Sequence, residues 1–310
     1  MTTKTEIMDI IGRKNWYFGL SLLVLIPGII ALFLWGLNLS IDFTGGSRLT
    51  LSFNNTVGEK QIQSINKILK SENIKVASVE KSNKLIFVRT APMDQSQNNK
   101  FISTLSKEFK GIKQQEFETI GPVIGQETTL NAFKAVGIAS FLIVLYITWS
   151  FRSVPKPASS LRFGICAIIA LIHDALVVIG IFAILGHFFN VEIDSLFVTA
   201  ILTVIGFSVH DTIVVFDRIR ENLKKMGSLN FSKTVNDSII QTMGRSLNTS
   251  LTVVLVLVTL LLFGGESIRW FVVALLIGVI SGTYSSIFNA APLLVLWQEI
   301  SNKKQAISNK

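Results

Sequence analysis

The chain has 310 residues, of which 49% are hydrophobic and only 16% are charged. Soluble domains carry about 25% charged residues, so this composition excludes a disordered or fibrous protein and argues against a single soluble globule. A lone cysteine excludes a disulfide framework and a cysteine-rich metal centre. The net charge of +9 would suggest nucleic-acid binding in a soluble protein. In a membrane protein it first indicates orientation.

Six apolar stretches are long enough to cross a bilayer, which takes roughly 20 residues of helix. The first is not a cleavable signal peptide, because its apolar core is too long and no Ala-x-Ala-like site follows it. Pro27 in the first stretch and Pro292 in the last predict kinks. The predicted spans are 16–37, 132–151, 163–185, 195–217, 246–264 and 268–297.

Residues 38–125, between the first two spans, are polar and contain several Asn- and Ser-rich turn signals. Alternating and helical apolar spacings predict an extracytoplasmic ferredoxin-like α+β domain of order β-α-β-β-α-β. Gly45-Gly46 is predicted to be a turn that interrupts a strand, not a nucleotide-binding motif. The predicted strands are Ile41–Phe53, Ile74–Val79, Leu85–Val88 and Ile112–Ile120, and the predicted helices are Gly58–Lys70 and Lys100–Phe109.

The basic residues next to the spans predict the orientation in the membrane. The short loops 186–194 and 264–267 contain no Lys or Arg. We therefore expect both termini to be cytoplasmic. The predicted parts of the chain are a cytoplasmic N-terminus with the first span (1–37), an outer domain (38–125), a five-helix bundle (126–300) and a cytoplasmic tail (301–310). This placement argues against a nucleic-acid partner. The basic residues assigned to the inner side are Lys4, Arg13, Lys14, Arg152, Lys156, Arg162, Arg218, Arg220, Lys224, Lys225, Lys233, Arg245, Lys303, Lys304 and Lys310.

Two acidic residues lie inside predicted spans, Asp174 midway along the third and Asp211 in the inner half of the fourth. A charged group in the bilayer core costs at least ~2.5–3.5 kcal/mol, so each needs a partner or a task. For each acid, one interpretation is a role in proton or ion coupling, and the alternative is a hydrogen bond that holds helices together. His173 and His210 precede these acids, but neighbouring helical residues point about 100° apart, so packing or interhelical bonding is the favoured interpretation.

Arg245 opens the fifth span and continues into a polar stripe at helical spacing. Arg245 is either an anchor at the inner surface or the counter-charge of Asp211. A stripe that faces the bundle would hold water and connect Asp211 to the cytoplasm, although such residues also serve as packing contacts. The stripe continues with Asn248, Thr249, Thr252 and Thr259.

The remaining membrane features predict packing. Small residues on one face of the sixth span let another helix approach closely. Beyond the fourth span, Phe216, Ile219 and Leu223 form an apolar stripe that predicts a helix lying along the inner surface or against a partner. Asp194 is a candidate cap of the fourth span. No phosphate-binding loop is present, so ATP is not the expected energy source. We expect no cofactor and no metal. The small-residue face of the sixth span comprises Gly278, Gly282, Ser285 and Asn289, with Ser281 beside them.

The chain resembles the SecF family, the smaller subunits of the bacterial SecD–SecF complex, within the resistance–nodulation–division (RND) superfamily. One span, an outer α/β domain and five further spans are half of the RND plan. The resemblance covers nearly the whole chain, and its most specific part is GFSVHDTIVVFDRIREN, at 206–222. Where His210 stands, the family often has Asn. The other matching motifs are IDFTGG at 41–46, GPVIGQE at 121–127 and RSLNTS at 245–250.

The resemblance implies a proton-driven transport subunit of the bacterial cytoplasmic membrane, not an enzyme. Its proton-pathway acid falls on Asp211 and the basic partner on Arg245. The implied partners are a SecD-like subunit with six further spans and a facing acidic residue, the Sec channel, an unfolded preprotein and the lipid bilayer. The proton gradient is the implied energy source.

Two other hypotheses remain open from the sequence. One is a lipid or drug exporter of RND type, although such proteins usually carry two six-span halves and larger outer domains in one chain. The other is an intramembrane aspartyl protease that uses Asp174 and Asp211. The chain lacks a Gly-x-Gly-Asp motif, and the helical rise of 1.5 Å per residue puts the two acids about 8 Å apart in depth, whereas a shared-proton pair needs them about 3 Å apart.

Overall fold

The computed structural model describes residues 8–152, 155, 159–226 and 230–308. The chain divides into two compact units, one made of residues 1–38 and 135–310 and the other of residues 39–134. Lys4, Lys156 and Lys310, which the orientation argument counted, lie outside the described residues.

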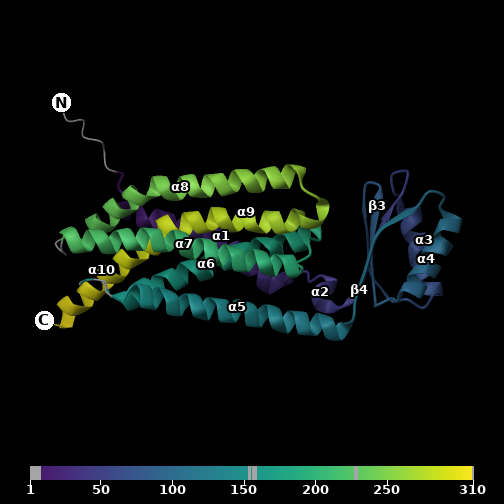
Figure 1. Ribbon diagram of the computed structural model, residues 1–310, viewed down its shortest axis with the longest axis horizontal. Coiled ribbons are helices and arrows are strands. Elements are labelled where there is room, and N and C mark those ends of the chain that lie inside the picture. Colours follow the sequence, from purple (N-terminus) through teal and green to yellow (C-terminus); the bar gives the residue numbers. More distant parts are fainter. Residues whose placement is uncertain (1–7, 153–154, 156–158, 227–229, 309–310) are drawn as a thin grey trace, which may run out of the picture. The chain divides into compact units, whose positions relative to one another are not determined.

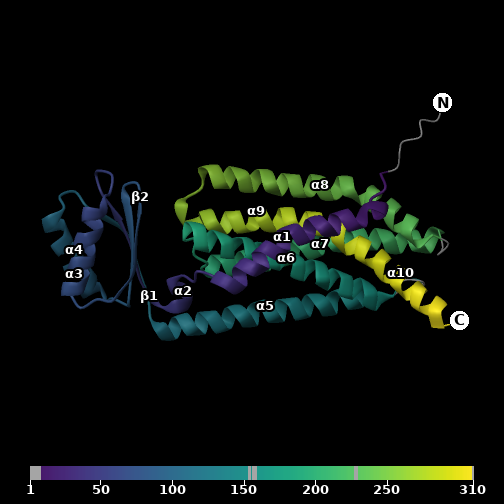
Figure 2. The same cartoon turned by 180° about the vertical axis from the view of Figure 1, so that it is seen from behind.

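Six helical segments are long and apolar enough to span a membrane, which confirms the predicted number of spans. Figure 1 shows the helices of the first unit running along one another, and Figure 2 shows α1 crossing obliquely over α6. The protein is a multi-pass membrane protein. The helices are α1 (Lys14–Trp35), α5 (Pro122–Ser150), α6 (Ser160–Phe189), α7 (Ser195–Met226), α8 (Phe231–Phe263), α9 (Arg269–Ser285) and α10 (Ala291–Ser308), with short 3-10 helices η1 (Ile11–Arg13) and η2 (Glu266–Ile268).

Several helices are longer than the predicted spans, because their polar ends carry caps rather than apolar residues. Helix α5 starts at Pro122, where a proline fits the first helical turn. Helix α8 starts at Phe231, and the side chain of Asn230 accepts a hydrogen bond from the backbone of Lys233. At the start of α7, Asp194 accepts from the backbone of Phe197, which confirms its predicted capping role.

The last span is interrupted by a π-helical turn, η3 (Ser286–Ala290), between α9 and α10. Pro292 follows directly and has no backbone N–H to donate to residue 288. A local π turn is one way for the chain to accommodate this missing bond. The predicted irregularity at Pro292 is therefore present, and it begins six residues earlier.

The apolar stripe at the end of α7 does not lie on the surface. Phe216, Ile219 and Leu223 are all buried within the chain. The ring of Phe216 packs against the rings of Phe151 and Phe163, with centroids 5.9 and 4.9 Å away. The prediction of a surface or partner helix was wrong, because α5, α6 and the first turns of α8 close over this stripe.

The second unit has the predicted order β-α-β-β-α-β. Its four strands form an antiparallel sheet in the order β2-β3-β1-β4, and Figure 1 shows both helices on one side of it. Alternate residues of the strands pack against these helices, and Leu49, Ile86 and Phe101 are completely buried. The elements are β1 (Gly46–Ser52), α3 (Glu59–Ser71), β2 (Val76–Ser82), β3 (Leu85–Thr90), α4 (Gln95–Glu108) and β4 (Lys113–Ile120).

The predicted strand Ile41–Phe53 was wrong in its first third. Ile41–Thr44 forms a short helix, α2, because the side chain of Ser40 accepts a hydrogen bond from the backbone of Asp42. Gly45 and Gly46 then follow with φ of +71° and +129°. Only glycine adopts these angles without strain, so the double glycine turns α2 into β1. Helix α4 begins five residues earlier than predicted, since Asp94 caps it in a capping box with Gln97.

Candidate functional site

Asp174 of α6 is the best-bonded acid within the membrane unit. Its side chain is 1% exposed. Oδ2 accepts hydrogen bonds from the hydroxyls of Ser208 on α7 and Ser285 on α9, both at 2.5 Å. Oδ1 accepts from the hydroxyl of Ser281 on α9 at 2.8 Å. One carboxylate therefore bonds to two further helices through three serine hydroxyls, which agrees with the helix-bonding alternative for this acid, although the sequence did not indicate the three serines.

His173 also reaches Asp174, with its Nδ1 3.0 Å from Oδ1. The sequence favoured packing or an interhelical bond for this histidine; its side chain is only 12% exposed, and the hydrogen bond that it forms is to its own neighbour. The side chains at these two positions leave the helix about 100° apart, but the imidazole is long enough to fold back. Its Nε2 atom is buried and has no hydrogen-bond partner among the described residues.

The small-residue face of α9 packs against α7, as predicted. A Cβ atom at Gly278 would lie 2.0 Å from Cγ2 of Val204, and one at Gly282 would lie 3.1 Å from Cβ of Ser208. Glycine at these positions lets the two helices approach closely. Ser285 belongs to the same face, but its hydroxyl bonds to Asp174, so packing explains only part of the face.

Asp211 of α7 has a different environment. Its side chain is 6% exposed, and its Oδ2 atom is buried with no hydrogen-bond partner among the described residues. Ser246 of α8 faces it across the contact between the two helices, but the serine hydroxyl does not reach hydrogen-bonding geometry. Buried carboxylate oxygens in proteins are normally bonded, so an unpartnered one at this depth needs an explanation.

Arg245 lies on α8 next to Ser246, but its side chain is exposed and forms no ion pair among the described parts of the chain. The polar stripe that continues from it does not line the interior of this chain. Asn248, Thr249 and Thr252 are exposed, and both threonines bond only to the backbone of their own helix. Ser246 and Ser250 are the α8 residues that face inward here.

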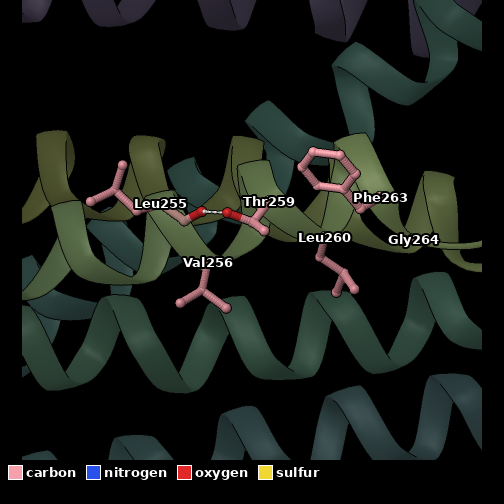
Figure 3. Close-up of a pocket in the computed structure, with 6 residues that line it drawn as sticks. All are labelled: Leu255, Val256, Thr259, Leu260, Phe263 and Gly264. Carbon is pink, nitrogen blue, oxygen red and sulfur yellow. Dashed lines mark hydrogen bonds between the residues drawn. The ribbon is translucent and has the colours of Figure 1, made fainter.

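Figure 3 shows a shallow pocket near the end of α8, where apolar side chains surround Thr259. The threonine hydroxyl donates to the carbonyl of Leu255 at 2.8 Å, so its proton is bound within its own helix. The pocket lies on the exposed side of α8 and carries no functional assignment. In the described ranges, no group of three or more His, Cys, Asp or Glu side chains is placed to hold a metal ion.

Comparisons with known proteins agree with this architecture. The family "Protein export membrane protein SecD/SecF, C-terminal" matches residues 100–300, and "SecD/SecF GG Motif" matches residues 30–57, which include the double glycine before β1. The chain belongs to the SecD/SecF family. It is 45% identical over 304 residues to the protein translocase subunit SecF of Thermobaculum terrenum, with 94% of each chain covered.

Some relatives of this chain are longer proteins named SecDF. The chain is 36% identical to the protein translocase subunit SecDF of Bacillus subtilis, over 96% of this chain and 39% of that protein. The crystal structure of SecDF from Thermus thermophilus matches with a TM-score of 0.82 and 32% identity, covering 96% of this chain. This chain spans 40% of the length of that solved protein. A second SecDF structure, in a super-membrane-facing form, matches with a TM-score of 0.69.

Proposed function

We propose that this chain works with a SecD-like subunit and uses the proton-motive force to promote preprotein export through the Sec channel. Its relatives are named as protein translocase subunits, which favours export of proteins over export of lipids or drugs. In the fused relatives, a single chain contains a region like this one and a longer remainder, which supports a SecD-like partner.

The unpartnered carboxylate of Asp211 carries the proposal. When protonated, it is neutral and tolerates its buried position between α7 and α8. When ionised, it needs a counter-charge, and Arg245 is the basic residue one position from the serine that faces it. Proton uptake from outside and release to the cytoplasm would alternate these two states and bias two arrangements of the helices.

One proton supplies enough free energy for a useful shift. Moving an elementary charge through 100 mV is worth about 2.3 kcal/mol. Because about 1.36 kcal/mol is tenfold in an equilibrium constant, this energy changes a two-state equilibrium roughly fifty-fold. The passage of one proton can therefore bias the helices strongly towards one of two arrangements, and we propose that this shift moves the outer domain and opposes back-sliding of the preprotein.

The exposed polar stripe of α8 supports a partner at this face. Asn248, Thr249 and Thr252 lie within the apolar span and form no bonds to other helices in the described part of the chain, and lipid offers no hydrogen-bond partners. We infer that a SecD-like subunit covers them and supplies the facing acid. Asp174 was also predicted to lie on the proton pathway, and we assign it a different task below.

The basic residues indicate the orientation. Arg152, Arg162 and Arg220 lie where α5 ends, α6 begins and α7 ends, and no Lys or Arg lies in the short loops at the opposite end of the unit, residues 190–194 and 264–268. By the positive-inside rule, we propose that both termini face the cytoplasm and that the sheet domain lies outside the cytoplasmic membrane.

The decisive experiment replaces Asp211 with Asn. Membrane vesicles that contain the variant and its SecD-like subunit should hold normal amounts of both proteins, because Asn has the same shape. Stimulation of preprotein transport by the proton gradient should fall at least tenfold, since the amide does not titrate. Asp217→Asn is the matched control, because Asp217 lies on the same helix in an exposed ion pair with Arg220. Gradient-stimulated transport at the wild-type level by Asp211→Asn would refute the proposed function.

A further inference from the structure

The Asp174 carboxylate joins three helices at one point. Ser208 of α7 and Ser285 of α9 both donate to Oδ2, and Ser281 of α9 donates to Oδ1. The acid itself is on α6. Because every donor from another helix is a short hydroxyl, none of these side chains is long enough to keep its bond if the helices slide past one another. This cluster therefore fixes α6, α7 and α9 relative to one another.

The contact between α7 and α9 continues one helical turn further. The hydroxyls of Thr212 on α7 and Ser286 in η3 are 2.9 Å apart, and the Ser286 hydroxyl lies 3.3 Å from the backbone carbonyl of Ser208 and 2.7 Å from that of Gly282. Towards the N-terminal end of α9, Gly278 and Gly282 lack a Cβ atom and let the backbones of α7 and α9 lie close together. Asp211 lies between Ser208 and Thr212 on this bonded segment of α7, so the cluster determines where its carboxylate points.

Along its membrane part, helix α8 forms fewer side-chain hydrogen bonds to this group of helices, and its contact with α9 is mainly the apolar cluster of Leu257 with Val272 and Val279. In the described part of the chain, the single side-chain hydrogen bond from the segment Arg245–Phe263 to another helix joins Ser250 to Thr283, at 2.6 Å. Two polar atoms at the contact of α7 with α8 have no partner there, Asp211 Oδ2 and Ser246 Oγ. The α8 side of Asp211 is unsatisfied, whereas the Asp174 side is fully bonded.

The other end of α8 is bound firmly to α7. Asn222 donates to the hydroxyl of Ser238 and to the side chain of Gln241, at 2.8 and 3.0 Å. Gly244 separates this bound segment from the membrane part, and a Cβ atom there would meet nothing within 4 Å. Glycine inside a helix lowers its stiffness, so Gly244 is a natural pivot.

We propose that Asp174 is a positioning residue that binds α6, α7 and α9 into one rigid unit through Ser208, Ser281 and Ser285, so that a change of charge on Asp211 moves the membrane part of α8 against this unit. The inference rests on the proposed function, because it names the parts that the proton moves. It replaces the earlier hypothesis that Asp174 itself carries protons.

The test uses two cysteine pairs at side chains that already touch, in a Cys166→Ala background. Ser250→Cys with Thr283→Cys joins α8 to α9. Thr212→Cys with Ser286→Cys joins α7 to η3. Disulfide sulfurs lie about 2.05 Å apart, so either pair needs only a small approach of its side chains. Each oxidised variant is compared with the same variant after reduction, in vesicles that also hold the SecD-like subunit.

We expect the oxidised disulfide between α8 and α9 to lower gradient-stimulated transport at least tenfold, and its reduction to restore transport. The oxidised disulfide between α7 and η3 should leave gradient-stimulated transport within twofold of that of the reduced form. Equal loss in both pairs, or no loss with α8 locked, would overturn the inference. Neither outcome touches the proposed function, which Asp211→Asn tests in the same vesicles.

Asp174→Asn gives a second, independent test. Its amide nitrogen donates instead of accepting, so the side chain no longer accepts from Ser208, Ser281 and Ser285 together. Gradient-stimulated transport should fall, and the oxidised disulfide between α7 and η3 should restore it at least threefold, because it replaces the bridge that the carboxylate makes between Ser208 of α7 and Ser285 of α9. A proton carrier would not be rescued in this way. If Asp174→Asn assembles but the disulfide does not restore its transport, the positioning role is overturned. If Asp174→Asn does not assemble, the comparison of the two disulfides with Asp174 intact decides between the alternatives.

Discussion

Replacing Gly278 with Ala is the sharpest test of the packing between α7 and α9. The added methyl group would lie 2.0, 2.7 and 2.9 Å from Cγ2, Cγ1 and Cβ of Val204. Carbon atoms pack at about 3.5–4.0 Å, so the closest pair must separate by roughly 1.5 Å. Valine has one strongly preferred rotamer in a helix and does not swing aside, so the helices themselves must move apart.

Overpacking of this kind costs typically about 1–3 kcal/mol, and occasionally more. We expect a cost in the upper half of that range, measured as a lower midpoint of thermal unfolding of the chain purified in detergent. Val204→Ala removes the two closest methyl groups and leaves only the Cβ contact at 2.9 Å, so the double variant should recover part of the loss. The coupling energy from the double-mutant cycle should then be at least about 1 kcal/mol.

Gly206→Ala is the matched control, since a Cβ atom at Gly206 of α7 would meet nothing within 4 Å. Because alanine favours a helix over glycine by about 1 kcal/mol, this variant should be as stable as the wild type or more so. If Gly278→Ala proves as stable as Gly206→Ala, or if Val204→Ala gives no recovery, α9 does not pack on α7 as described.

Two further predictions concern α8. Gly244→Ala should raise thermal stability, because the position has open space, and should lower gradient-stimulated transport at least twofold by stiffening the pivot. Gly137→Ala is the control, because it also lies in open space and should change stability alone. Equal transport in both variants would argue against a pivot at Gly244. Asn236→Ala should destabilise the chain by about 1–3 kcal/mol in a thermal melt, because Asn236 Oδ1 accepts hydrogen bonds from the backbone N–H groups of Ile10 and Ile11. Asn230→Ala removes only an exposed helix cap and should lower the stability by less.

The sequence determined the parts of this protein that follow from local chemistry. Long apolar runs predicted all six spans, because only a helix satisfies its own backbone inside a bilayer. Alternating and helical spacings predicted the sheet domain, and one acid in an apolar stretch drew attention to Asp211. The error at Ile41–Thr44 came from a side-chain cap at Ser40, which alternation of apolar residues does not reveal.

Only the tertiary structure decided which polar groups meet. Ser208, Ser281 and Ser285 look like ordinary helix-packing residues along the chain, and nothing in their spacing indicates that all three bond to Asp174. The stripe that starts at Arg245 has the right helical period, but the period alone does not say whether it faces the bundle or its surface. The sequence gives the face of a helix that is polar; the rotation of each helix against its neighbours, set by packing such as Gly278 on Val204, determines what that face contacts.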